Sequence, residues 1–454
     1  MKNINFLSYT KFQYKRFTNN IISFFSVFSF QTIIQIIYPP AMLFAWGVEN
    51  FGVWVFLTSI PTTLSILNIN VSFASRTEMS VNFEKKKYDE VSKIFCNSFF
   101  LVLFNMIIFS LISLGIFLTQ DSNIEIFNNL DINNLDSILL LIILAFYFTI
   151  LDNFLFLGIT YTGNVAKYNY ITLSYEIILK ILIPLSGIFF NDLIYPSIIL
   201  LIINFLKNLT LFVIYKNNKK KFSLIFTNYD FKYIKFLFRL SLSFYFQNVS
   251  SIIKNNGILI LSGFYFGPSI VGLITTTKTL FYYLPNRFLD ILNSSLYYEY
   301  SKSFGQKKFN HLILIFKTQI KFTLLVLLFF ILCSLIFGRK IYGFWLNYEY
   351  DLTFMLLFLI IMESFLFNLY NSIEVLIKAV NKFFKTTMIS LFFSLTTLLI
   401  TYILFNMDYS FYFYFYINLL SSLSILIFVC YFTYQFCKKI KYLNVFIKKN
   451  FLIK

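Results

Sequence analysis

The chain contains 454 residues, of which 58% are hydrophobic and only 13% are charged, and its mean hydropathy is +0.73. Soluble domains carry about 25% charged residues, so this composition excludes a soluble enzyme or binding domain. The net charge of +18 would suit a nucleic-acid-binding protein, but the basic residues lie between long apolar segments, which argues against that class.

Apolar segments of about 20 residues follow one another along the chain, and each is long enough to cross the roughly 30 Å hydrocarbon core of a bilayer as a helix. We predict twelve membrane-spanning helices, at 20–45, 52–73, 94–118, 137–160, 170–190, 196–215, 237–263, 269–297, 314–337, 352–376, 386–405 and 411–434. The predicted fold class is therefore an all-α polytopic membrane protein.

Lys and Arg residues are concentrated on one side of the predicted membrane. If both termini are cytoplasmic, nearly all basic residues outside the spans lie in cytoplasmic segments, and only Arg339 and Lys340 lie on the other side. This is the positive-inside distribution, and it predicts both termini in the cytoplasm. It also attributes the positive charge to topology rather than to nucleic-acid binding.

The sequence repeats itself after about 220 residues. The motif GVENFGVW begins at Gly47 and GPSIVGLI begins at Gly267, and each lies between two apolar segments. The basic turns that follow, FEKKKYDE and SFGQKKFN, match after a one-residue slip that aligns Lys87 with Lys308. Such self-similarity indicates a duplicated architecture.

A further match aligns Asn164 with Asn381, and the long basic segment 216–235 lies midway along the chain. We therefore predict a six-helix lobe at 1–215, a cytoplasmic linker at 216–235 and a second six-helix lobe with a basic tail at 236–454. An even number of spans gives both lobes the same orientation, so the repeat is parallel, about an axis along the membrane normal.

The first helix of each predicted lobe carries a polar stripe, because its polar residues are spaced by one helical turn. These residues are Gln31 and Gln35 in the first lobe and Gln247, Ser251, Lys254 and Asn255 in the second. Two interpretations are open: the stripes line a water-filled cavity between the lobes and contact the substrate, or they form hydrogen bonds between helices within each bundle. Recurrence in both halves favours the cavity.

Lys254 and Lys278 lie well inside predicted spans and have no acid one turn away on their own helices. A charge at the bilayer centre costs about 2.5–3.5 kcal/mol on insertion scales, so each needs a partner. One interpretation is an anionic ligand such as a phosphate or pyrophosphate. The other is pairing with Asp152 or Glu363, which are mid-span acids that also lack local partners.

Arg287 is a third candidate for the substrate site, because a guanidinium can bind a phosphate through two hydrogen bonds even beside Asp290. Pro285 is predicted to kink the same helix. Asp152 and Glu363 are candidates for coupling transport to a proton or sodium gradient.

Other intramembrane charges have structural interpretations. Glu176 and Lys180, and likewise Glu374 and Lys378, are spaced by four residues and are predicted to neutralise each other. Lys207 is predicted to extend its ammonium group toward the inner surface of the membrane.

No metal, cofactor or catalytic site is predicted. The four cysteines lack the spacing of a metal or disulfide framework, and His311 is the only histidine. The sequence also lacks a glycine-rich phosphate loop, which excludes an ATP-driven motor.

The twelve spans, the glycine-containing outer turn after the first and a basic turn of the type x-G-x-K-K-F after the eighth resemble the polysaccharide-repeat (Wzx-type) flippases of the MATE-like multidrug/oligosaccharidyl-lipid/polysaccharide exporter superfamily. Arg76 matches a basic residue of that family, whereas Asn68-Ile69-Asn70 stands where the family often has Asp-x-Gly. The resemblance implies alternating-access transfer of undecaprenyl-pyrophosphate-linked O-antigen or capsule repeat units across a bacterial inner membrane.

The resemblance also implies interactions with membrane lipids, with a polysaccharide polymerase and with a chain-length regulator of lipopolysaccharide synthesis. Two alternatives remain. A MATE-type drug or cation antiporter would need acids to dominate the cavity of the first lobe. A membrane polysaccharide polymerase or glycosyltransferase would need a large outer loop, and the longest predicted outer turn has fewer than twenty residues.

Overall fold

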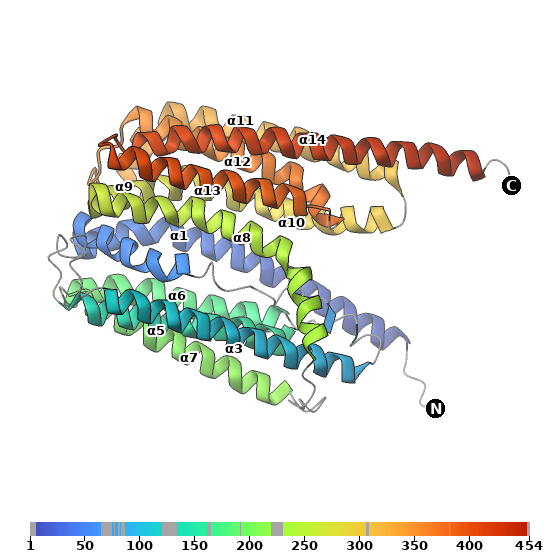
Figure 1. Cartoon of the computed structure of the whole chain (residues 1–454), viewed down its shortest axis with the longest axis horizontal. Helices are drawn as coiled ribbons and strands as arrows, with labels where there is room; N and C mark the ends of the chain where they lie inside the picture. Colours follow the sequence, from blue (N-terminus) through green and yellow to red (C-terminus); the bar gives the residue numbers. More distant parts are fainter. Residues whose placement is uncertain are drawn as a thin grey trace. The chain divides into compact units, whose positions relative to one another are not determined.

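The computed structural model describes residues 6–64, 75–76, 78–79, 82, 87–119, 134–160, 165–190, 192–218, 230–305, 308–380 and 382–451 (Figure 1). Regular structure in these residues is helical, which confirms the predicted all-α class. Nine helices of the described chain are long and apolar enough to cross a membrane, so the protein is a multi-pass membrane protein.

The predicted spans at 237–263 and 269–297 are also helical, but they are not among these nine apolar helices. The first belongs to α8 (Phe231–Phe266), which is long but less apolar because it carries the predicted polar stripe. The second is divided among three shorter helical elements. The prediction of twelve spans therefore remains a prediction.

Two compact units make up the chain, Met1–Tyr245 and Phe246–Lys454, and the boundary between them falls inside α8. The predicted linker, 216–235, is described only at its two ends, where α7 finishes and α8 starts. The predicted linker and lobe boundaries therefore stay predictions.

The first unit consists of α-helices that pack in pairs, α1 on α6 and α5 on α7, with α3 against α5. Its elements are α1 (Phe6–Leu64), α3 (Tyr88–Thr119), α5 (Leu135–Thr160), α6 (Val165–Phe189), α7 (Ile194–Asn218) and the start of α8. Its core contains the buried side chains of Phe95, Phe154 and Leu211, so aromatic rings fill the space between α3, α5 and α7.

The second unit is organised around α12 (Phe354–Ala379), which packs against α10, α11 and α14. Its other elements are the rest of α8, α9 (Pro268–Lys278), the π-helix η3 (Thr279–Tyr283), α10 (Leu284–Gly305), α11 (Phe309–Trp345), α13 (Phe384–Asn406) and α14 (Tyr412–Phe451). Because one face of α12 is buried along its whole length, polar residues on that face must find partners inside the unit.

The two glycine corners of the repeat have the same backbone conformation. Gly47 joins the two halves of α1 with φ 74° and ψ 177°, and Gly267 joins α8 to α9 with φ 83° and ψ 173°. This region of backbone space is accessible essentially to glycine alone. The sequence match between the corners is therefore a structural match, as a parallel repeat predicts.

The one-residue slip is also present in the structure. The amide of Lys87 donates to Asn82 O, and the amide of Lys308 donates to Ser303 O, both at 2.9 Å. The carbonyl groups of these lysines then accept from Val91 and Leu312, at 3.2 and 3.1 Å. The hydrogen bonds around the two basic turns thus match with one extra residue in the second unit.

The offset between the repeats is 220 at the glycine corners and 221 at the basic turns, and in the second unit the π-helix η3 lies between these two points. Its counterpart in the first unit, at 59–63, lies within α1 and is α-helical. A π-helical turn contains one more residue than an α-helical turn, so η3 can accommodate an extra residue. Pro285 lies two residues after the end of η3 and has no N–H to bond a carbonyl in the preceding turn, which favours this irregular segment where a kink was predicted.

Some sequence features of the repeat lie outside the described residues. These are Asn164 and Asn381, the Asn68-Ile69-Asn70 segment, and parts of the two basic turns at 83–86 and 306–307.

Alanine at either glycine corner should destabilise the protein. Gly47→Ala and Gly267→Ala each place a Cβ on a backbone with positive φ, although no atom within 4 Å blocks it, so the cost is backbone strain of about 1–3 kcal/mol. Thermal unfolding of the purified protein measures the effect. Gly115→Ala in α3 is the matched control, because Gly115 also has open space but a helical backbone, and it should be neutral or slightly stabilising.

A buried polar network holds α10, α11 and α12 together. Gln319 donates to Asn293 Oδ1 at 2.9 Å and to Ser372 O at 3.2 Å, and the hydroxyl of buried Tyr300 donates to Gln319 Oε1. Gln319→Leu leaves that hydroxyl unpaired and should cost about 1–3 kcal/mol of stability. Denaturant unfolding checks this result, and the exposed neighbour Thr318→Ala should change stability by less than about 0.5 kcal/mol.

Candidate functional site

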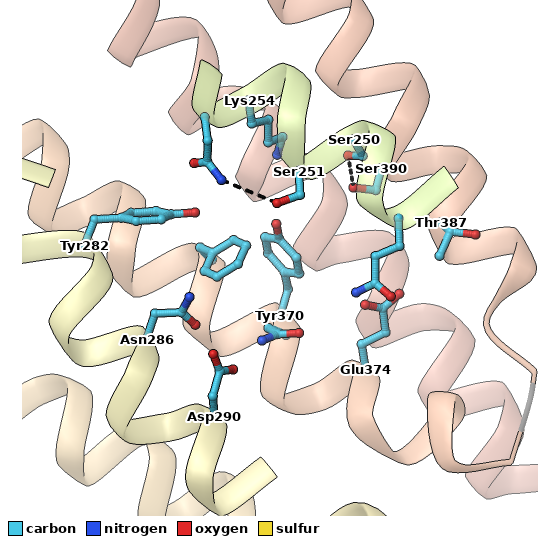
Figure 2. Close-up of a pocket in the computed structure, with 14 residues that line it drawn as sticks. Ser250, Ser251, Lys254, Tyr282, Asn286, Asp290, Tyr370, Glu374, Thr387 and Ser390 are labelled. Atoms are coloured by element: carbon cyan, nitrogen blue, oxygen red, sulfur yellow. Dashed lines mark hydrogen bonds between the residues drawn. The ribbon is translucent and has the colours of Figure 1, made fainter. Parts of the chain in front are cut away.

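A polar cavity of about 160 Å³ lies within the second unit, between α8, α10, α12 and α13 (Figure 2). Its walls combine amides, hydroxyls and charged groups with aromatic rings. The lining residues are Gln247, Ser250, Ser251, Lys254, Asn255, Tyr282, Asn286, Asp290, Phe367, Tyr370, Asn371, Glu374, Thr387 and Ser390.

Helical spacing explains why these residues share one space. On α8, Gln247, Ser251 and Lys254 follow i, i+4, i+7 spacing and face the cavity together with Asn255. The predicted polar stripe of the second lobe therefore lines a cavity within the second unit, and the predicted cavity between the lobes stays a prediction. The hydroxyls of Ser250 and Ser390 are 2.7 Å apart and join α8 to α13 beside it.

Lys254 is the buried cation of this cavity. The residue is only 7% exposed, and its Nζ has no hydrogen-bond partner among the described residues. The centroid of the Tyr370 ring is 5.8 Å from Nζ, which gives a weak cation–π contact. The Tyr414 hydroxyl donates to the Lys254 carbonyl at 2.6 Å, so the backbone at this position is held in place while the ammonium group lacks a partner.

Lys278 has a different environment, because it forms an ion pair with Glu363 on α12. Its Nζ is 3.4 Å from Glu363 Oε1, and the two side chains are 1% and 3% exposed. The rings of Tyr282, Tyr414 and Phe415 surround the ammonium group at 5.5–5.8 Å. Of the two interpretations of the mid-span lysines, neutralisation by an acid therefore describes Lys278, which does not line the cavity.

The same glutamate also influences Lys254, which is attracted by Glu363 and repelled by Lys278. Because the direct ion pair of Glu363 is with Lys278, the Lys254 ammonium group has no ion pair of its own among the described residues.

Two acids line the opposite side of the cavity (Figure 2). Glu374 is neutralised by Lys378 at 2.9 Å, as predicted, and it accepts a hydrogen bond from Thr386 Oγ1 at 2.5 Å. Asp290 has no ion pair within 4 Å among those of the described chain, although it interacts electrostatically with Arg287 and Lys378. Arg287 itself does not line the cavity.

In the first unit, Asp152 and Lys207 form an ion pair of 2.5 Å between α5 and α7. Their side chains are 10% and 15% exposed. The prediction that Lys207 extends toward the membrane surface is therefore wrong, because its ammonium group pairs with Asp152 on the neighbouring helix. The prediction missed this pair because the residues are 55 positions apart in the sequence.

The polar stripe of the first unit makes contacts between helices. Gln31 donates to Glu176 Oε2 on α6 at 2.8 Å, and Gln35 is half-buried one turn further along α1. The Lys180 ammonium lies 3.7 Å from the centroid of the Tyr38 ring. Among the described residues Glu176 and Lys180 form no ion pair within 4 Å, but they interact electrostatically, so the predicted neutralisation acts at a longer distance while each side chain contacts α1.

Most cavity residues on η3, α10, α12 and α13 were not predicted from the sequence. Tyr282, Asn286 and Asp290 are spaced by four residues, and Tyr370 and Glu374 are spaced likewise on α12, so helical periodicity was the available signal. The abundance of aromatic residues, 22% of the chain, conceals the few that line a cavity.

No protein-family model matches the sequence, and no curated protein matches it. Solved structures of several transporters share its fold along nearly the whole chain. A multidrug resistance MATE family transporter of the MOP superfamily, in an inward-facing conformation, has a TM-score of 0.62 and 11% identity over 92% of this chain and 95% of its own.

A MOP superfamily transporter from Pyrococcus furiosus, in which reverse polarity of the binding pocket suggests a different function, has a TM-score of 0.65 and 10% identity over 94% of this chain and 96% of its own. The lipid II flippase MurJ, in an inward closed conformation, has a TM-score of 0.62 and 16% identity over 90% of this chain and 87% of its own. At these identities the similarity shows the fold. The chain has the MATE-like fold of these transporters.

Proposed function

We propose that this protein is a flippase that translocates undecaprenyl-pyrophosphate-linked oligosaccharide repeat units, of the O-antigen or capsule type, across the bacterial inner membrane by alternating access. The observation that carries the proposal is Lys254, a buried cation without a hydrogen-bond partner that lines a polar cavity in a MATE-like fold. Its charge favours an anionic ligand, because an uncompensated cation at membrane depth is costly until a counter-charge arrives.

The charge of the cargo also fits the direction of transport. An inside-negative membrane potential favours outward movement of an anionic head group by about 2.3 kcal/mol per charge per 100 mV. The prenyl tail needs no polar site, because it can stay in the lipid. Binding of an anionic oligosaccharide to the cavity that Lys254 lines would lower the cost of moving the cargo through the membrane.

The alternative of an antiporter for cationic drugs is less favoured, because the uncompensated charge of Lys254 would repel a cationic substrate. Proton coupling at Asp152 or Glu363 remains part of the proposal, but at each site the proton would have to compete with a lysine, Lys207 or Lys278. Protonation of either acid would break a buried ion pair, so the two events are linked.

Lipid analysis of a deletion strain tests the function. Loss of a flippase should leave completed single repeat units, still linked to undecaprenyl pyrophosphate, on the cytoplasmic leaflet. Loss of a polymerase should instead display single repeat units outside the cell. Purified protein in liposomes should then speed the movement of fluorescent lipid-linked oligosaccharide between leaflets, compared with protein-free liposomes. Efflux of ethidium without lipid movement would instead support the antiporter.

A further inference from the structure

Three buried polar atoms that have no hydrogen-bond partner in the described part of the chain line the same cavity. They are Lys254 Nζ and Asn255 Oδ1 on α8 and Asn286 Oδ1 on α10. Figure 2 shows Lys254 and Asn286 on two different helices that border this space. Buried polar groups almost always have partners, so this set indicates a ligand that accepts from the ammonium group and donates to the two amide oxygens.

The aromatic rings of the cavity add a second requirement. Tyr282 on the π-helix and Phe367 and Tyr370 on α12 all line it. The face of an aromatic ring is electron-rich and packs well against C–H groups that carry a partial positive charge. A pyranose ring has such a C–H face and also carries hydroxyl groups that can donate hydrogen bonds. A sugar therefore satisfies both the amide oxygens and the rings.

The charges limit how anionic this sugar can be. Lys254 offers one positive charge without an ion pair, whereas Asp290, an acid without an ion pair among the described residues, lines the other side of the cavity and would repel a polyanion. A pyrophosphate carries more than one negative charge, and its oxygens accept hydrogen bonds but cannot donate to the Asn255 and Asn286 oxygens. The cavity therefore suits one carboxylate on a hydroxylated ring better than it suits a pyrophosphate.

We infer that this cavity is a specificity site for an acidic sugar, a uronate within the transported oligosaccharide, whose carboxylate binds Lys254 and whose hydroxyls donate to Asn255 and Asn286. The inference rests on the proposed function and names the class of sugar that the same cavity binds. The pyrophosphate group of the lipid then lies outside this cavity.

Binding of soluble probes to the purified protein tests the inference directly. D-glucuronate, D-glucose and inorganic pyrophosphate are titrated against the full chain in detergent by calorimetry. We expect D-glucuronate to bind at least about tenfold more tightly than D-glucose, because only the uronate makes a charge-assisted hydrogen bond with Lys254. Pyrophosphate binding that exceeds glucuronate binding and depends on Lys254 would overturn the inference while leaving an anionic cargo in place.

Two variants distinguish the contribution of the Lys254 charge to D-glucuronate binding from that of the hydrogen bonds to Asn286. Lys254→Met should lower the affinity for D-glucuronate at least about tenfold and leave the affinity for D-glucose nearly unchanged. This variant should fold, because it replaces a buried charge with an apolar side chain of similar length. Asn286→Asp keeps the acceptor oxygen but adds a negative charge, so it should weaken D-glucuronate binding and spare D-glucose. Lys340→Met, an exposed lysine of the same unit, is the control and should change neither affinity.

Transport of two cargoes distinguishes failure of the inference from failure of the proposed function. In liposomes, lipid-linked oligosaccharides with and without a glucuronate residue are compared. Faster movement of the uronate cargo in the wild type, with the difference lost in Lys254→Met, supports the inference. Equal movement of both cargoes overturns the sugar class but keeps the flippase, and movement of neither overturns the flippase itself.

Discussion

Glu363→Gln should destabilise the protein by about 3–5 kcal/mol, the usual cost of leaving one member of a buried ion pair without its partner. Glu363 and Lys278 are 3.4 Å apart with side chains that are 3% and 1% exposed, so water cannot replace the lost charge. Lys254 loses an attractive charge in the same substitution and is left facing Lys278. Denaturant unfolding in detergent micelles measures the loss.

Two controls make this result specific. Lys278→Met combined with Glu363→Leu removes both charges and should restore stability to near the wild type, because replacing a buried pair with apolar groups is often neutral. Arg339→Gln breaks a pair with Asp351 at 3.8 Å whose side chains are 57% and 94% exposed, so it should cost less than about 1 kcal/mol. If Glu363→Gln lowers the free energy of unfolding no more than Arg339→Gln does, the ion pair of Glu363 with Lys278 does not stabilise the protein as expected.

Lys254→Met should slow the transport of an anionic lipid-linked oligosaccharide about 10- to 150-fold, the factor that corresponds to losing one hydrogen bond to a charged group. The effect arises at the cavity, because this is the lysine whose ammonium group lines it without a partner. Initial rates of lipid movement in liposomes, divided by the amount of folded protein, measure it. Lys254→Arg keeps the charge and should retain most of the rate.

The same assay separates the roles of the two mid-span lysines. Lys278→Met leaves Glu363 unpaired, so it should reduce the yield of folded protein more than the transport rate of each folded molecule. Lys254→Met should do the reverse. If both variants lower the rate per molecule equally, Lys278 contacts the cargo and the cavity extends beyond its present lining.

Local spacing allowed the parts of this structure that depend on a single helix to be predicted from the sequence. The glycine corners at Gly47 and Gly267 were found as matching positions of the repeat, and both have a backbone that glycine adopts readily. The α8 stripe was found because Gln247, Ser251 and Lys254 obey helical periodicity. The pair of Glu374 and Lys378 is one turn apart on α12, and it forms as predicted.

Contacts between helices were harder to predict, because sequence separation says little about which helices pack together. Asp152 and Lys207 have no local partners and meet across α5 and α7. Glu176 has a lysine one turn away, yet it bonds Gln31 on α1 because the packing of α1 on α6 brings that amide closer. Sequence spacing identifies two residues that can pair on one helix, and the packing of neighbouring helices determines whether they do.

The repeat also indicates where the units differ chemically. When the repeats are aligned on their glycine corners, Ile34 and Thr58 match Lys254 and Lys278, so the two lysines belong to the second unit alone. The two corners share a backbone conformation, whereas the charges on the helices beside them differ.

The π-helix η3 changes the rotational phase of the helix on either side of it. Compared with the regular α-helix at 59–63, the added residue rotates the side chains before it by about 100° relative to those after it. Lys278 and Asn286 are eight residues apart, so they would differ by about 80° around a regular α-helix, and the added residue reduces this difference to about 20°. Lys278, which pairs with Glu363, therefore lies on nearly the same side of this helical path as Asn286 and Asp290, which line the cavity.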